Sequence, residues 1–252
     1  QNGELNGGTD SSRKFFSDTF TVFLWFMIFS SVLVYIFMPK LVTLVAPGFN
    51  ADEIKQLISI SRIMVLSPIL LGLSNLFGSV TQMYRKFLVF SLSPLFYNLG
   101  IILGIIFLYP LFGLKGLALG VVFGAFLHAV IQLPVLIRHN FLPSLSFNIN
   151  WKDLKRLVNT SLPRTLGLSV HTLSLIAIVA IASKIGEGSI SIFQFSLNLQ
   201  NVPLGIIGAS YSVAAFPTLA QFFAGSRIRE FVEYITVAAR QIIFWSLPIM
   251  FL

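Results

Sequence analysis

Residues 20–38 read FTVFLWFMIFSSVLVYIFM and contain no charged side chain. As a helix, this stretch is about 29 Å long, close to the roughly 30 Å thickness of a bilayer's hydrocarbon core. Hydrocarbon offers no partners to backbone groups, and a helix satisfies them within one segment. The stretch therefore predicts a membrane-spanning helix, and Pro39 is expected to close it because proline lacks the N–H that helices use.

Further apolar blocks follow along the rest of the chain. They cover residues 54–84, 87–109, 114–137, 161–183 and 190–223, and a last block runs from residue 231 to the end. These blocks are long and continuous, which favours helices over the alternating strands of a membrane barrel. We predict an all-α polytopic membrane protein, a helix bundle with about seven transmembrane helices. The chain starts at Gln1 and stops inside an apolar run, so we expect an internal piece of a longer protein.

The composition excludes several classes of protein. Hydrophobic residues make up 56% of the chain and charged residues 10%, with a mean hydropathy of +0.86. A soluble domain carries about 25% charged residues, so a soluble enzyme, a disordered chain and a coiled coil are excluded. There is no Cys, and the three His are scattered without metal-ligand spacing. No catalytic motif is present, so we predict no enzyme activity, no catalytic residue, no metal and no cofactor.

The basic residues predict the orientation. One set of alternate connections holds Arg13, Lys14, Arg85, Lys86, Arg138, Lys152, Lys155, Arg156, Arg227 and Arg229, and the other set holds Lys40, Lys55, Lys115 and Lys184. Cytoplasmic loops carry the excess of Lys and Arg, so this ten-to-four bias places the N-terminal stretch in the cytoplasm. The net charge of +8 is spread thinly, and no nucleic-acid partner is predicted.

The longest connection predicts where the domains divide. Within residues 141–160, apolar residues recur at helical spacing over Trp151–Val158 with basic residues between them. This pattern predicts a short amphipathic helix on the cytoplasmic side, in a linker between two bundles. Residues 1–140 would then hold four transmembrane helices, and residues 161–252 three, the last one truncated.

Cations inside the spans are the first candidate site residues. Arg62 lies inside the second block, and Arg164 follows Pro163 at the start of the fifth. Such side chains either extend to the headgroup region or line a cavity for an anionic substrate. All nine acids fall in loops or near span ends, so we expect no coupling carboxylate at mid-membrane in this part of the protein.

Amides in the sixth block are the second set of candidates. Gln194, Asn198 and Asn201 recur at i, i+4 and i+7 and therefore share one helix face. They either form hydrogen bonds between helices or line a hydrated cavity, and His171 in the fifth block could join either arrangement. Pro203 and the glycines after it are expected to let this span bend.

An ordered set of motifs resembles the MurJ (MviN) family of lipid II flippases, within the multidrug/oligosaccharidyl-lipid/polysaccharide exporter superfamily. The motifs are LVAPGF at 44–49, RIM at 62–64, SLPRTLGLSV at 161–170, GEGSIS at 186–191, NVPLGIIG at 201–208 and AAFPTL at 214–219. The resemblance implies two six-helix lobes around a central cavity. The chain would hold the family's third to ninth spans, with the first lobe ending at the 138–160 connection.

The resemblance also implies a function. An undecaprenyl-diphosphate-linked peptidoglycan precursor, lipid II, would pass from the inner to the outer leaflet of the bacterial cytoplasmic membrane by alternating access. Its diphosphate would be held by cavity cations, while membrane lipids surround its tail. The implied substrate-binding residues are Arg164, Asn198, Asn201, Gln194, Arg62 and His171. This function does not fix the protein partners, and cell-wall synthesis proteins are the candidates.

One difference from the family pattern means that the substrate is not determined by the resemblance. Asn198 stands where the family tends to carry an arginine, and asparagine brings a hydrogen bond but no charge. The alternatives are an exporter of another polyprenyl-linked polysaccharide unit or of a drug, or a non-transporting membrane scaffold for cell-wall synthesis. The exporter alternatives predict a coupling carboxylate in spans outside this sequence, and the scaffold predicts tolerance to loss of every cavity cation.

Overall fold

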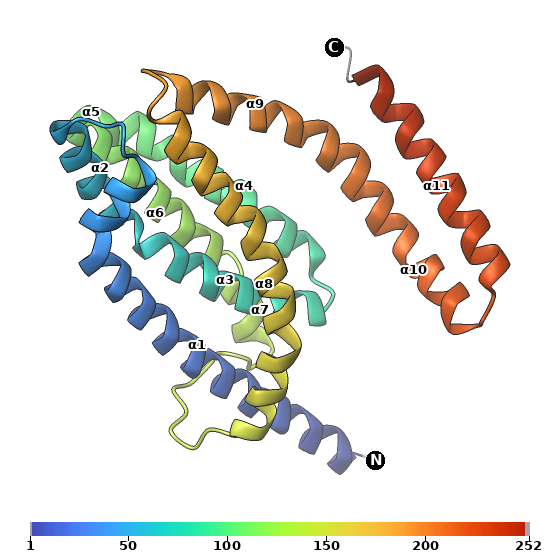
Figure 1. Cartoon of the computed structure of the whole chain (residues 1–252). Helices are drawn as coiled ribbons and strands as arrows, with labels where there is room; N and C mark the ends of the chain where they lie inside the picture. The colour runs from blue at the N-terminus through green and yellow to red at the C-terminus, as the bar shows by residue number, and fades with distance from the viewer. Residues whose placement is uncertain (1, 250–252) are drawn as a thin grey trace. The chain divides into compact units, whose positions relative to one another are not determined.

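The computed structural model describes residues 2–249, except for the side chains of residues 2–10, 209, 210, 212–214, 216, 217, 220 and 249. Across these residues the chain forms helices and short connections and no strand (Figure 1). The elements are α1 Asn2–Val45, α2 Ala51–Met64, α3 Leu66–Met83, α4 Phe87–Leu103, the π-helical turn η1 Gly104–Leu108, α5 Tyr109–Phe112, α6 Leu114–Val130, α7 Leu133–Arg138, α8 Trp151–Ala182, α9 Ser189–Pro203, the π-helical turn η2 Leu204–Ala209, α10 Ser210–Ala224 and α11 Ile228–Ile249.

Within residues 2–249, six helical segments are long and apolar enough to cross a membrane. They are Ser11–Val45, Ala51–Met83, Phe87–Phe112, Leu114–Arg138, Trp151–Ala182 and Ser189–Gly208. They confirm the first six predicted spans. The predicted seventh span corresponds to α11, which carries charged residues in its first half and is not among the six. Its expected truncation at Leu252 lies outside the described residues.

Two predicted helix ends are wrong. Pro39 does not close the first helix, since α1 runs on to Val45 with this proline inside it. The third predicted block, residues 87–109, also ends too early, because Pro110 lies in the first turn of α5, which continues to Phe112. The first turn needs no N–H donor, so proline fits there without loss. A proline inside a membrane helix is tolerated where its surroundings satisfy the freed carbonyl.

The second span is interrupted where a proline follows. Helix α2 ends at Met64 and α3 begins at Leu66, with a turn at Val65 between them. Pro68 cannot donate a hydrogen bond to the Met64 carbonyl, so the regular ladder has a gap at this point. The span therefore consists of two helical segments.

The predicted amphipathic helix forms, but as part of a longer one. Trp151 to Val158 is the first part of α8, which continues without a break through Pro163 to Ala182. Asn150 caps this helix by accepting a hydrogen bond from the Lys152 backbone N–H at 3.2 Å. No breaker stands between this cap and the fifth span, so the connection and the span join into one rod.

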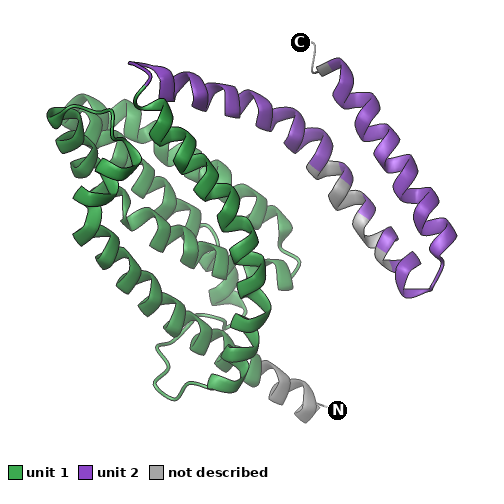
Figure 2. Ribbon diagram, viewed as in Figure 1, with its two compact units in different colours: residues 1–184 green, residues 185–252 purple. Residues whose placement is uncertain are grey.

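The chain divides into two compact units, residues 1–184 and residues 185–252 (Figure 2). Unit 1 contains α1 to α8, and unit 2 contains α9, η2, α10 and α11. The predicted border between two lobes at residues 141–160 concerns the architecture of the whole protein and stays a prediction.

Close contact between the α4–η1 segment and α6 organises unit 1, and these elements lie side by side in Figure 1. Glycines recur every fourth residue on both: Gly100 and Gly104 on one, Gly116, Gly120 and Gly124 on the other. A Cβ atom on Gly100 would lie 2.3 Å from the Gly124 Cα, and one on Gly104 would lie 2.3 Å from the Gly120 Cα. Small residues of this kind let two membrane helices approach backbone to backbone.

Unit 1 also contains an apolar core. Its buried residues come from α1, α3, α6, α7 and the connection that follows α7, namely Phe16, Phe77, Val80, Ala129, Leu136 and Phe141. Rings of Phe16 and Phe141 meet edge to face, with centroids 6.1 Å apart. This core ties the connection between α7 and α8 to the bundle.

Replacing Gly100 by alanine is expected to destabilise the full-length protein by about 1–3 kcal/mol, because the added methyl group forces the two backbones apart. The measurement is thermal unfolding of the purified full-length protein in detergent. Gly167→Ala on α8 is the matched control, since a Cβ there meets nothing within 4 Å. Equal melting temperatures of the two variants would contradict the glycine contact.

Candidate functional site

The six predicted site residues fall in both units. Unit 1 holds Arg62 on α2 and Arg164 and His171 on α8, and unit 2 holds Gln194, Asn198 and Asn201 on α9. The structure brings residues together within each unit, and each unit is described by itself below.

Arg62 is half-buried and packs against an aromatic ring. Its Cζ atom lies 4.7 Å from the centroid of the Tyr35 ring on α1, a cation–π distance. Its Nε atom is buried without a hydrogen-bond partner. Arg62 and Tyr35 line a cavity of about 490 Å³ together with Lys55, Ser59 and Lys115. The sequence singled out Arg62 but missed these neighbours, because they come from three different helices.

Arg164 and His171 lie two turns apart on one side of α8, and both are exposed. Neither side chain has a hydrogen bond to the described part of the chain. Only Leu154 and Ala182, near the two ends of α8, are buried. The C-terminal end of α8 is also attached to unit 1, since the Gly48 N–H donates to the Ser183 Oγ at 3.2 Å. Its middle thus presents Arg164 and His171 on a surface that unit 1 does not cover.

The three amides lie on one exposed face of α9, as the spacing predicts. Within residues 2–249 the side chains of Gln194, Asn198 and Asn201 form no hydrogen bond to another helix. The expected bend follows directly, because the helix changes to the π-helical turn η2 after Pro203. This turn holds Gly205 and Gly208, and π-helical turns occur often at functional sites.

The sequence did not predict a buried polar network that joins α3 to the end of α6 and to the turn between α6 and α7. The Ser74 hydroxyl donates to the His128 carbonyl at 2.8 Å and lies 2.6 Å from His128 Nδ1. The Gln132 side-chain amide donates to the Ser74 carbonyl at 3.1 Å, and Thr81 donates to Gln132 Oε1 at 3.4 Å. Ser74, Thr81 and Gln132 are fully buried. Hydrogen bonds of this kind join membrane helices where no water competes.

Asp18 is a buried carboxylate that holds the start of α8. It is 1% exposed and lies within α1, although the sequence placed it in a polar stretch before the first span. Its Oδ2 accepts a hydrogen bond from the Asn150 backbone N–H at 3.0 Å, and its Oδ1 is buried without a partner. A negative charge at a helix N-terminus is favourable, so Asp18 complements the dipole of α8.

Two neighbours of Asp18 fix the same connection. The Ser144 backbone N–H donates to the Ser17 hydroxyl at 3.3 Å, and the Ser146 backbone N–H donates to the Thr21 hydroxyl at 2.9 Å. Ser17, Asp18 and Thr21, polar residues within about one turn of α1, thereby satisfy backbone groups of the connection between α7 and α8.

Comparisons with known proteins identify the family. The family model described as "Lipid II flippase MurJ" matches residues 3–252, nearly the whole chain. The chain belongs to this family. The match confirms the resemblance that the ordered motifs indicate, and with six candidate spans it makes the chain a multi-pass protein of the bacterial inner membrane.

Curated relatives of the MurJ family are similar in sequence to most of the chain. A "Probable lipid II flippase MurJ" of Buchnera aphidicola is 28% identical over 94% of this chain and 47% of the relative. The "Lipid II flippase MurJ" of Burkholderia cenocepacia is 24% identical over 97% of this chain and 48% of the relative. The chain thus spans about half the length of these relatives.

A solved structure has the same fold. The chain superimposes with a TM-score of 0.78 on "Lipid II flippase MurJ, inward closed conformation", at 20% identity over 95% of this chain and 49% of that chain. This likeness confirms that the arrangement of helices is that of a MurJ-family membrane protein.

In this MurJ-family chain, replacing Asp18 by alanine is expected to cost about 1–3 kcal/mol of stability, because the Asn150 N–H loses its buried acceptor. Asp18→Asn keeps an acceptor oxygen and is expected to cost less. The measurement combines thermal unfolding of the full-length protein with the rate of tryptic cleavage after Arg138, which the released connection would accelerate.

The matched control is Asp52→Ala, which removes an exposed carboxylate whose ion pair to Lys55 is also exposed. Surface pairs contribute little, so this variant should resemble the wild type. Equal stability of Asp18→Ala and Asp52→Ala would show that the carboxylate does not anchor α8.

Proposed function

We propose that the full-length protein moves lipid II, a polyprenyl-diphosphate-linked peptidoglycan precursor, from the cytoplasmic to the outer leaflet by alternating access. The observation that carries this proposal is the family match over residues 3–252, together with relatives that bear the flippase name. We also propose that the N-terminal end of this chain lies in the cytoplasm, as its charge bias predicts.

Physical features of the chain support such a role. A diphosphate needs cations and hydrogen-bond donors, and Arg164, Asn198 and Asn201 are exposed on α8 and α9, whose segments are apolar enough to cross a membrane. Charged and amide side chains on a membrane helix are costly facing lipid, so they favour a water-filled cavity. The polyprenyl tail can stay in the bilayer while the headgroup moves through this cavity, so no enzyme chemistry is required.

A second candidate substrate is another polyprenyl-linked polysaccharide unit. It is favoured by Asn198, which stands where the family tends to carry an arginine. An amide can hydrogen-bond a sugar or a phosphate but provides no charge, so the headgroup that this protein prefers could differ from that of lipid II.

Complementation tests the transport of lipid II. The full-length protein is expressed in cells depleted of their own lipid II flippase, and its membrane level is verified. We expect growth to be rescued, and Arg164→Ala to lower rescue about tenfold because one charged contact to the diphosphate is lost. Arg229→Ala is the matched control, an exposed arginine at the start of α11 with no described partner.

Failure of the wild type at normal expression would overturn lipid II as the substrate. Full activity of Arg164→Ala would remove Arg164 from the site. Tolerance to loss of Arg62 and Arg164 together would instead favour a scaffold that transports nothing.

The amide face of α9 makes a separate prediction. Asn198→Ala is expected to lower rescue about fivefold, the size of one lost neutral hydrogen bond. Gln200→Ala removes an exposed amide from a different face of the same helix and should leave rescue unchanged. Equal effects of the two substitutions would show that the spacing of Gln194, Asn198 and Asn201 has no bearing on transport.

A further inference from the structure

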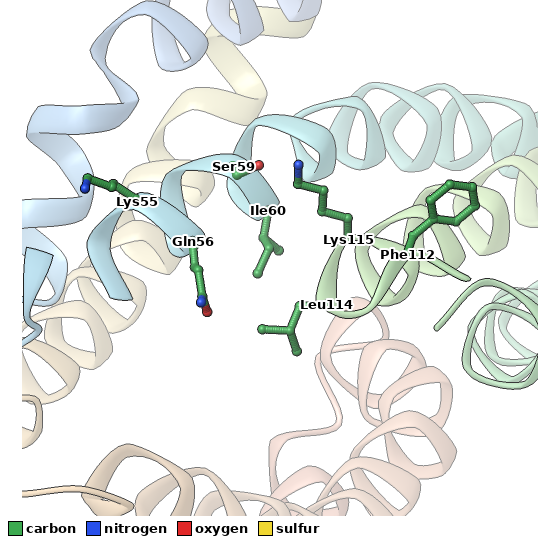
Figure 3. A pocket seen from close by; sticks show the side chains of 7 residues that line it. All are labelled: Lys55, Gln56, Ser59, Ile60, Phe112, Leu114 and Lys115. Carbon is green, nitrogen blue, oxygen red and sulfur yellow. The ribbon is translucent and has the colours of Figure 1, made fainter. Parts of the chain in front are cut away.

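Two adjoining cavities lie where α2 meets the start of α6. One is about 500 Å³ in volume and is lined by Lys55, Gln56, Ser59, Ile60, Phe112, Leu114 and Lys115 (Figure 3). The other, of about 490 Å³, shares Lys55, Ser59 and Lys115 and adds Arg62 and Tyr35. All the lining residues belong to unit 1. No carboxylate lines either cavity, so their charged groups are all cations.

The cations of these cavities are not equivalent. Lys55 forms an ion pair with Asp52, Nζ to Oδ1 at 3.4 Å, and in Figure 3 its ammonium group points away from Lys115. Arg62 and Lys115 have no carboxylate oxygen of the described residues within 4 Å. In Figure 3 the Lys115 side chain extends from α6 alongside Ser59 of α2. The uncompensated charge of this region therefore belongs to Arg62 and Lys115.

Arg62 contacts an aromatic ring, but its guanidinium N–H groups donate no hydrogen bond to the described residues. The Arg62 Cζ atom lies over the Tyr35 ring, 4.7 Å from its centroid, while the buried Nε has no acceptor. The Ser59 hydroxyl, one turn away on the same helix, also forms no hydrogen bond within residues 2–249. Only the Arg62 Nε is a buried donor without a partner, which costs free energy, whereas the Ser59 hydroxyl is half-buried and unused. A ligand that supplies acceptor oxygens would use both donors.

We propose that Arg62, Lys115 and Ser59 bind the phosphate group of a membrane lipid. A planar guanidinium matches two phosphate oxygens at once, an ammonium group adds a point charge, and a hydroxyl adds a third donor. The apolar side chains of Ile58, Ile63 and Leu114 line the same cavities and suit the lipid chain. The charge bias predicts that Lys55 and Lys115 lie outside the cytoplasm, so the site would face the outer leaflet.

Two lipids share this chemistry. One is a polyprenyl diphosphate, the anchor of the transported precursor at its release, and this source rests on the proposed function. The other is an anionic phospholipid of the outer leaflet, which does not depend on transport. The site is the same for both, so the experiment has one arm for each lipid.

Native mass spectrometry of the purified full-length protein, in a neutral detergent, measures binding of undecaprenyl diphosphate in one arm and phosphatidylglycerol in the other. The double variant Arg62→Gln, Lys115→Gln is expected to bind one or both lipids at least about tenfold more weakly than the wild type. Lys115→Gln alone changes an exposed side chain, so it tests the site without endangering the fold, and it should lower affinity several-fold.

Lys184→Gln is the matched control, because it removes an exposed lysine from the same predicted side that lines neither cavity. It should change affinity less than twofold. Wild-type affinity of the double variant for both lipids, or a loss no larger than that of Lys184→Gln, overturns the site. Loss of phosphatidylglycerol binding in a protein that fails complementation would support the site while refuting lipid II transport.

Discussion

The constraint on which this structure depends is that hydrocarbon offers no hydrogen-bond partner to a backbone. Each span must satisfy its own N–H and C=O groups, so the chain remains helical across positions that would end a helix in water. Pro39 and Pro163 lie inside continuous helices for this reason. Inside the spans, the ladder changes at the turns of Val65 and of residues 131–132 and at the π-helical turns η1 and η2, and each of these stands close to a proline in the sequence.

Once the spans are helical, their packing relies on contacts other than the hydrophobic effect. Lipid tails are as apolar as leucine, so close backbone approach and interhelical hydrogen bonds determine which helices pair. In unit 1 the glycines of α4, η1 and α6 allow the close backbone approach, and Ser74, His128 and Gln132 form the interhelical hydrogen bonds. The α7–α8 connection is bound through buried polar groups of α1, with Asp18 at the start of α8.

Charge is distributed in a manner that suits an anionic cargo. Cations such as Arg62, Arg164 and Lys115 lie at cavities or on exposed helix faces without a carboxylate of the described residues beside them. Asp18, the one deeply buried acid among the side chains that the structure describes, holds a helix start and an adjoining connection. A headgroup with phosphate oxygens would therefore find hydrogen-bond donors in two places within unit 1, the exposed middle of α8 and the cavities between α2 and α6.

Much of this could be predicted from the sequence alone. Long apolar blocks predicted the six helical segments that can cross a membrane, because the thickness of hydrocarbon sets the length of a span, and the ordered motifs indicated the family. The spacing of Gln194, Asn198 and Asn201 also sufficed to place them on one face, since helical periodicity is a local property. Only the tertiary structure decided that Tyr35, Ser59 and Lys115 surround Arg62, and that Asp18 meets Asn150. Those contacts join residues far apart in the chain, and no local pattern records which helices approach closely enough to make them.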